Sequence, residues 1–387
     1  MADGGGLVSS KKKPPPRSTP INAAGKAALR TLKAIPIVRD KVVPWLVRED
    51  IDQIPSAPMV GSMRRELDRI SKVPGRVMVG PWLSEVGFEL LYWIPFLRWA
   101  VAEFNIDPAR LIMVSRGGVS HWYEGIAGDY VDMFDLYSVD EYRHTNDARW
   151  QDAGNQKQYD AGRFDQVIRK RVAERRGVEI ETMLHPSVMY RLLRFFWYEK
   201  AAVSLFSKHT RMEAMSKPSL PPDRYGLPER YTAVRFYFRP SFPDTPDNRA
   251  LIRSLMQRLS AEKPIVLLNT GIRIDDHDDM EFGPEKGVYR IDHALTASDN
   301  LGVQTAVIAN ADAFVGTYGG LAYLGPFLNV PTVGFYSNPA ELVPAHLDVT
   351  WRLCREMQSP LTVLSTADVA LLSKVIAAPV GVNAATA

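Results

Sequence analysis

The stretch from Thr305 to Tyr336, TAVIANADAFVGTYGGLAYLGPFLNVPTVGFY, predicts how the second half of the chain folds. Its apolar and polar residues predict a helix that ends at Asn310, a buried strand over 313–316, a tight turn over 317–320, a second helix over 321–328 and a second strand over 332–336. Helices that alternate with short apolar strands are typical of a parallel α/β sheet. We therefore expect an α/β protein.

The turn in this stretch is a candidate anion site formed by Thr317, Tyr318, Gly319 and Gly320. Glycine lets the backbone approach a ligand closely, and the N-terminus of a helix favours negative charge. In open α/β sheets, ligands bind beyond the carboxyl ends of the strands. The turn therefore predicts phosphate binding, while a tight turn that needs glycine for its backbone alone remains the alternative.

Length and composition indicate a soluble two-domain protein. The chain has 387 residues, of which 46% are hydrophobic, and this is enough for more than one core. The apolar runs are shorter than the roughly 20 residues of a membrane-spanning helix, and no signal peptide is evident, so we expect a cytoplasmic protein. Cys354 is the single cysteine, which excludes an internal disulfide framework.

Positive charge is concentrated at the N-terminus. Residues 1–50 hold ten Lys or Arg against four Asp or Glu, a local charge of +6, whereas the whole chain carries +3 and the remainder therefore −3. The run KKKPPPR lies in a Gly- and Pro-rich opening that cannot form a packed core. A solvated arm is the favoured interpretation, and no nucleic-acid partner is expected. Peripheral contact with the inner face of a membrane is the alternative.

Composition shifts divide the chain into five regions. They are a basic N-terminal extension and linker over 1–62, a first Rossmann-like domain over 63–216, a Pro-rich linker over 217–231, a second Rossmann-like domain over 232–378 and a tail over 379–387. In the first domain we predict strands over 76–79, 111–115 and 178–182, helices over 63–71, 164–176 and 185–206 and one from Val86, and a loop or lid over 145–163. In the second, strands are predicted over 232–238, 265–268 and 288–290 before the opening stretch.

Candidate catalytic residues of the first domain follow its first two strands. Glu85 and Glu89 lie at the start of the helix after the first strand, and His121 follows the Gly117–Gly118 turn after the second. A carboxylate or imidazole at these positions could face a ligand at the strand ends. Carboxylates in the first turn of a helix are also ordinary caps and dipole partners, which is the alternative for both glutamates.

Candidate ligand-binding residues of the second domain also gather near strand ends. Arg235, Arg239 and Arg273 could converge on a diphosphate, because guanidinium groups bind phosphate with paired hydrogen bonds. Asn269 ends another strand. The acidic run RIDDHDD over 273–279 could bind a divalent cation, or Asp275 or His277 could bond a ribose hydroxyl, but a solvated loop is favoured over a metal site.

Several motifs are absent. No GxGxxG follows the first strand, and the sequence contains no GxxxxGK[ST] or GxSxG. Dehydrogenases, P-loop nucleotide hydrolases and serine hydrolases of the elbow type are therefore disfavoured.

Two Rossmann-like halves with a phosphate-type turn in the second resemble glycosyltransferases of the GT-B architecture, whose domains face each other across a cleft. VGFELLYWIPFLRW over 86–99 resembles the first-domain loop and helix of heptosyltransferase-type enzymes, and ADAFVGTYGGLAYLGPFLNVPTVGFYS over 311–337 resembles their donor-phosphate segment. The chain departs from these enzymes at Gly319–Gly320, where they carry Thr-Gly, and at Tyr323, where they carry His. Arg235 and Arg239 also resemble the arginines of fucosyltransferases that bind a GDP-sugar.

The resemblance implies inverting transfer of a sugar from a nucleotide-diphospho-sugar to a hydroxyl, on a cell-surface polysaccharide or glycolipid precursor, without a metal or other cofactor. The amides of Gly319–Gly320 and an arginine would stabilise the leaving phosphate, and Thr317, Tyr318 and Tyr323 would supply polar contacts. Glu89 would accept the acceptor's proton, with Glu85 and then His121 in reserve. A nucleotide-sugar epimerase or hydrolase of the same fold, and a non-catalytic binding protein, are the alternatives.

Overall fold

The computed structural model describes residues 57–153, 156–198, 203–220, 225–270, 272, 278–280 and 286–369. From Pro58 onward, these residues belong to one compact unit. The predicted N-terminal extension up to residue 56, the tail over 379–387 and the residues Arg273, Asp275 and His277 lie outside the described residues.

The first domain contains a four-stranded parallel sheet in the order β3-β2-β1-β4. Its strands are β1 (Arg76–Val79), β2 (Leu111–Ser115), β3 (Asp129–Asp132) and β4 (Ile180–Leu184). Every residue of β2 is buried, as expected for a parallel strand covered on both faces. The helices of this domain are α3 (Ala57–Lys72), α4 (Val86–Phe88), α5 (Ile94–Glu103), α6 (Val139–Ala153), α7 (Arg163–Arg176), α8 (Ser187–Tyr198) and α9 (Val203–Lys208).

The second domain contains a six-stranded parallel sheet in the order β12-β11-β10-β5-β7-β9. Its strands are β5 (Thr232–Arg235), β7 (Ile265–Leu267), β9 (Val288–Arg290), β10 (Ala313–Thr317), β11 (Thr332–Tyr336) and β12 (Leu361–Ser365). Its helices are α11 (Pro246–Glu262), α12 (Asn300–Ala309), α13 (Leu324–Phe327) and α14 (Pro344–Met357). This is the doubly wound order, in which the strand sequence reverses between β5 and β10.

The expected α/β fold with two Rossmann-like domains is confirmed, and several elements differ from the predictions. Residues 145–153 belong to α6 rather than to a loop, and α3 begins at Ala57 rather than Met63. β3 and β12 were not predicted. β3 carries an aspartate at each end, which weakens its apolar pattern, and β12 lies beyond the 305–336 stretch on which the prediction for this domain was based. The predicted strand over 232–238 divides into β5 and β6 (Tyr237–Phe238), and β6 pairs with β8 (Asp278–Asp279) in a separate antiparallel ribbon.

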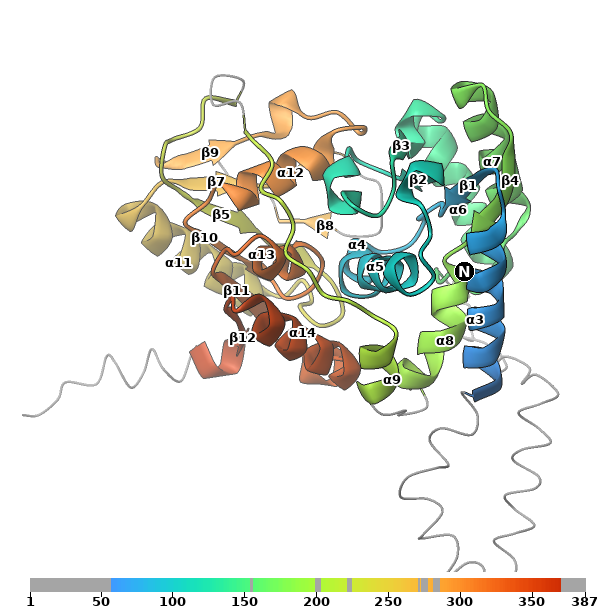
Figure 1. Ribbon diagram of the computed structural model, residues 1–387. Helices are drawn as coiled ribbons and strands as arrows, with labels where there is room; N and C mark the ends of the chain where they lie inside the picture. The colour runs from blue at the N-terminus through green and yellow to red at the C-terminus, as the bar shows by residue number, and fades with distance from the viewer. Residues whose placement is uncertain are drawn as a thin grey trace, which may run out of the picture. The chain divides into compact units, whose positions relative to one another are not determined.

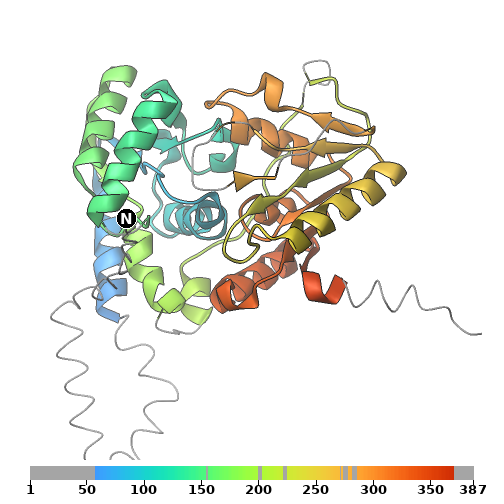
Figure 2. The same cartoon turned by 180° about the vertical axis from the view of Figure 1, so that it is seen from behind.

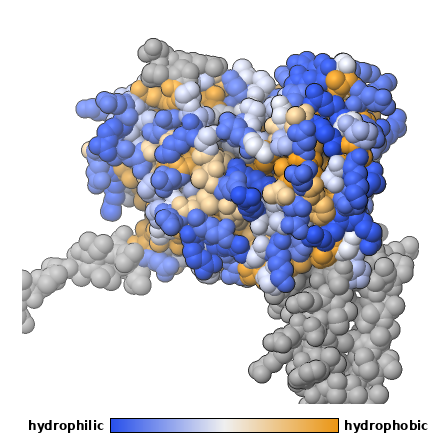
Figure 3. Space-filling view, in the orientation of Figure 1, coloured by the Kyte–Doolittle hydropathy of each residue, from blue (hydrophilic) through white to orange (hydrophobic). Residues whose placement is uncertain are grey.

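Helix α5 of the first domain lies between the two sheets in both ribbon views (Figures 1 and 2). One hydrophobic cluster runs through both domains: it includes Val77 and Leu111 of the first sheet and Val266 and Phe314 of the second. In the space-filling view, hydrophilic residues cover much of the face shown, and apolar residues appear in patches between them (Figure 3). None of the described helices has the length and apolar character needed to cross a membrane.

Backbone contacts at glycine join the first domain to α12. Gly302 N donates to Gly117 O over 2.7 Å, and a Cβ at Gly302 would lie 2.5 Å from Gly118 O. Asp132 holds the other side of this loop, because its Oδ2 accepts from Gly118 N over 2.8 Å. Any side chain larger than a hydrogen atom at position 302 would therefore push the loop and α12 apart.

We predict that Gly302→Ala destabilises the protein by about 1–3 kcal/mol, because the new methyl group overlaps backbone that cannot retreat cheaply. Gly61→Ala is the matched control in α3, where a Cβ would meet only the end of the Arg65 side chain at 3.4 Å. It should stabilise the protein by about 0.5–1 kcal/mol through helix propensity. Urea unfolding of both variants measures the difference, and an equal effect of the two substitutions would contradict the tight contact.

Candidate functional site

A cavity of about 290 Å³ lies where the two domains meet, and both contribute to its lining. The lining residues of the first domain include Glu85, Gly87, Phe88, Tyr92, Arg116 and Lys157. Those of the second include Arg235, Tyr237, Arg239, Tyr318, Gly320, Tyr323 and His346. Because β5 and β10 end at Arg235 and Thr317, the cavity adjoins the point where the strand order of the second sheet reverses. This is the position at which doubly wound sheets bind ligands.

The predicted turn after β10 is present, but the helix after it is shorter than predicted. A four-residue 3₁₀ turn, η7 (Gly320–Tyr323), leads into the four-residue α13, so the dipole of a long helix does not contribute here. Gly319 and Gly320 have φ angles of 116° and 47°, which favour glycine. A Cβ at Gly87 would lie 3.3 Å from Gly320 N, so the first domain packs directly on this turn.

The tyrosines and the threonine of the turn have mainly structural contacts. Thr317 Oγ1 donates to Tyr237 O over 2.9 Å and accepts from Tyr237 N, which fixes the ends of β10 and β6 together. The hydroxyl groups of Tyr318 and Thr350 on α14 hydrogen-bond over 3.1 Å. Tyr318 and Tyr323 both line the cavity and are more than nine-tenths buried. They therefore shape the cavity wall.

Two of the three predicted arginines reach the cavity. Arg235 at the end of β5 donates from Nη1 to Gln304 Oε1 over 2.6 Å. Arg239 lies against the glycine turn, since a Cβ at Gly319 would be 2.6 Å from its Nη1. Its buried Nε has no hydrogen-bond partner among the described residues. Asn269 is buried, lies outside the lining, and donates to Met280 O over 2.7 Å.

The structure brings Glu85, but not Glu89, to the cavity. Glu85 is the residue before α4, lines the cavity and accepts from Lys157 Nζ over 2.8 Å. Glu89 opens a π-helical turn, η2 (Glu89–Trp93), between α4 and α5 and is fully buried. Its Oε1 accepts from Ser115 Oγ over 2.5 Å and from the Tyr123 hydroxyl. Burial raises the pKa of Glu89 to about 7, against the opposing charge of Arg116.

His121, the remaining catalytic candidate, also lies outside the cavity lining. It belongs to a short 3₁₀ turn, η4 (Ser120–Tyr123), after β2. Burial lowers the pKa of His121 to about 4, so the ring is neutral near pH 7. The geometry gives it no direct part in chemistry at this cavity.

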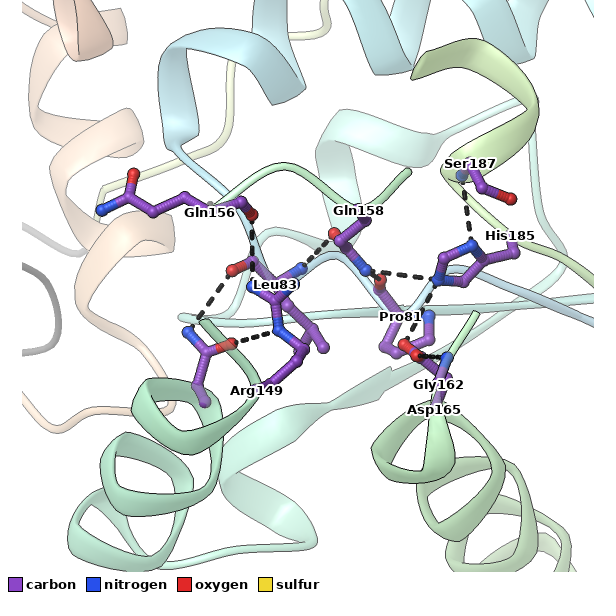
Figure 4. Close-up of polar contacts among 10 residues, drawn as sticks. Pro81, Leu83, Arg149, Gln156, Gln158, Gly162, Asp165, His185 and Ser187 are labelled. Atoms are coloured by element: carbon purple, nitrogen blue, oxygen red, sulfur yellow. Dashed lines mark hydrogen bonds and ion pairs between the residues drawn. The ribbon is translucent and has the colours of Figure 1, made fainter. Parts of the chain in front are cut away.

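Arg116 and Lys157 are lining residues that sequence reasoning missed. Arg116 follows β2 and donates from Nη2 to Ser84 O over 2.7 Å. Lys157 belongs to the segment 156–162. Figure 4 shows the polar contacts that hold this segment in place. Gln158 accepts from Leu83 N over 2.9 Å and donates to Pro81 O over 2.8 Å. No motif marks Lys157, because its partner Glu85 lies 72 residues away.

Positive charge prevails among the described residues of the cavity lining. It contains the basic side chains Arg116, Lys157, Arg235 and Arg239 and the carboxylates Glu85 and Glu341. Burial lowers the pKa of His346 to about 3, so this lining residue adds no charge near neutral pH. An anionic ligand is therefore favoured electrostatically.

No protein-family model and no curated protein matches this chain. Among solved structures, a glycosyl transferase family 9 protein from Veillonella parvula matches with 14% identity and a TM-score of 0.40, over 79% of this chain and 90% of its own. An E. coli heptosyltransferase solved with ADP matches with 12% identity and a TM-score of 0.39, over 77% of this chain and 99% of its own.

A UDP-GlcNAc 2-epimerase from Methanocaldococcus jannaschii matches with 9% identity and a TM-score of 0.32, over 78% of this chain and 91% of its own. Glycosyltransferases of the type that the sequence resembles are thus among the matching structures. Identities and scores this low say nothing of the reaction, which has to be inferred from the residues of the cavity.

The buried Glu89 carboxyl predicts a pH-dependent stability. Its pKa is about 7 in the folded protein and 4.5 ordinarily, so the folded state binds the proton more tightly. The resulting stabilisation is complete below pH 4.5 and is lost as the pH rises through 7. Relative to Glu89→Gln, the wild-type free energy of unfolding should fall by about 3 kcal/mol between pH 4.5 and 8.

Urea unfolding at several pH values measures this difference. Burial also raises the pKa of Asp132, to about 6. This group titrates in both proteins, so its own contribution cancels and only its smaller charge coupling to Glu89 remains in the difference. A difference between the two proteins that does not change with pH would contradict the shifted pKa of Glu89.

Proposed function

We propose that the protein is a glycosyltransferase that moves a sugar from a nucleotide-diphospho-sugar to a hydroxyl of a glycan or glycolipid precursor, with inversion at the anomeric carbon. The observation that carries the proposal is the composition of one cavity. The second domain borders this cavity with Arg235, Arg239 and the Gly319–Gly320 turn, where the strand order of its sheet reverses. The first domain borders it with Glu85. Diphosphate-binding groups and a carboxylate base are the two components that such a transfer requires.

The donor diphosphate is assigned to the second domain. Charge grows on the phosphate as its bond to the anomeric carbon breaks, and fixed guanidinium groups stabilise that charge in a site that excludes water. Arg239 suits this role because it lies on the glycine turn and its Nε has no hydrogen-bond partner in the part of the chain that the structure describes. Arg235, held by Gln304 at the end of β5, supplies a second positive charge.

Glu85 is assigned as the base in place of Glu89. A general base must come within hydrogen-bond reach of the acceptor hydroxyl, and Glu85 lines the cavity whereas Glu89 does not. Glu85 would take the hydroxyl proton while the acceptor oxygen forms its bond to the anomeric carbon. In the same displacement the bond to the phosphate oxygen breaks, and the nucleoside diphosphate leaves.

The first experiment identifies the donor and the reaction together. A thermal-shift screen with ADP, GDP, UDP and dTDP, and with CMP as control, selects the nucleotide, since a ligand at 100 times its Kd adds about 2.7 kcal/mol of stability. The matching nucleotide sugars are then incubated with and without glycan acceptors. Nucleoside diphosphate release that depends on acceptor supports a transferase, whereas release or epimerised sugar without acceptor points to a hydrolase or epimerase.

We predict that Glu85→Gln lowers kcat by about 10²–10⁴-fold, because glutamine is nearly isosteric but cannot accept the proton. Glu89→Gln is the matched control: the same change four residues along the chain, outside the cavity lining. It should leave kcat within about tenfold of wild type, an effect of stability and packing alone. A large loss of kcat in Glu89→Gln with normal Glu85→Gln would return the role to Glu89.

We also predict that turnover survives EDTA. The proposed stabilisers of the leaving phosphate are arginine side chains, so the reaction needs no bound cation. Most of the acidic run over 273–279 lies outside the described residues. The EDTA experiment therefore also tests whether this run binds a metal ion that the reaction needs. If EDTA stops turnover and Mg²⁺ or Mn²⁺ restores it, the metal-free mechanism is wrong.

A further inference from the structure

Lys157 is a cation of the cavity lining, and the segment 156–162 carries it. Its Nζ lies 2.8 Å from Glu85 Oε2 and 3.2 Å from the centre of the Phe88 ring. Its side chain is 13% exposed. The ammonium group is therefore enclosed between a carboxylate and an aromatic face, at the boundary with the arginines of the second domain.

Buried polar contacts fix the backbone that carries this lysine. Gln158 is 1% exposed and bonds both Leu83 N and Pro81 O in the loop after β1 (Figure 4). Farther along, Asp165 Oδ2 accepts from Gly162 N over 2.6 Å, and its Oδ1 accepts from His185 Nε2 over 3.2 Å. Both ends of the segment 156–162 are thus anchored, so the backbone at Lys157 is held while its side chain can change conformation.

Enclosing the lysine in this way is energetically costly. Burial lowers the pKa of Lys157, and the Glu85 carboxylate opposes that shift. A lysine loses about 2 kcal/mol of rotamer freedom when it is held in one conformation. An ammonium group offers three donors, and the Glu85 contact uses one of them. A ligand with several anionic oxygens could bind this group more strongly than a single carboxylate does.

We propose that Lys157 is an exchangeable counter-ion of Glu85, which a diphosphate entering the cavity draws away from that carboxylate. The inference rests on the proposed function for its consequence in catalysis. A donor that takes the ammonium group removes the Lys157 charge from beside Glu85, which makes that carboxylate a stronger base toward an acceptor hydroxyl. Binding of the donor would in this way prepare the base.

The test is a double-mutant cycle with inorganic pyrophosphate as the probe, measured by calorimetric titration. Lys157→Met should weaken pyrophosphate binding by about 10- to 100-fold, the worth of a charge-assisted hydrogen bond. Glu85→Gln should tighten binding several-fold, because the competing carboxylate is gone. That gain should be larger when Lys157 is present than in the Lys157→Met background.

Lys170→Met is the matched control, since Lys170 lies on α7 with 79% exposure and pairs with Glu174 outside the cavity. It should leave the affinity unchanged. If Lys157→Met does not fold, Lys157→Gln completes the same cycle, with melting curves recorded for every variant.

Three outcomes overturn the proposal. An equal gain from Glu85→Gln in both backgrounds would mean that the carboxylate only repels the anion and does not compete for Lys157. Unchanged affinity in Lys157→Met, or no binding of pyrophosphate by the wild-type protein, would remove Lys157 from the anion site. Pyrophosphate carries no sugar, so a cycle with the expected coupling would stand even if no transferase activity were found.

Discussion

Close approach of backbone to backbone joins the two domains, and the cavity depends on it. Gly302 of α12 meets the Gly117–Gly118 loop after β2, and Gly87 meets Gly320 in the turn after β10. Each contact sets a loop from the carboxyl end of one sheet against an element of the other. The groups that follow the strands therefore face one shared space, and neither sheet would enclose that space alone.

The sequence predicted the fold well because the strands are short, apolar and separated by helical patterns. β2, β10 and β11 lie within a residue of their predicted bounds. The errors have physical causes. α6 is strongly polar and presents little apolar periodicity, so its pattern resembled a loop. The helix predicted after the glycine turn is short, because 3₁₀ geometry at Gly320–Tyr323 takes up its first turn.

The site was predicted only in part. Arg235, Arg239 and the glycine turn reach the cavity because topology alone brings the ends of β5 and β10 together. Glu85 and Glu89 are four residues apart, a spacing that places side chains on one face of a regular helix. Glu85, however, is extended with ψ of 143° before the helix begins, and Glu89 opens a π-helical turn, so the two carboxylates diverge. The position of Lys157 in the cavity depends on the contacts of Gln158 with the loop after β1, which no local sequence pattern reveals.

The hydrophobic cluster that includes Val77 and Leu111 also includes Val266 and Phe314. Apolar burial is the main driving force of folding, and a surface that loses its cover returns to water. Cutting the chain between the two sheets would therefore expose the hydrophobic surface of each fragment to water. The two Rossmann-like domains are separate in topology, but because they share this cluster we expect them to unfold together as one cooperative unit.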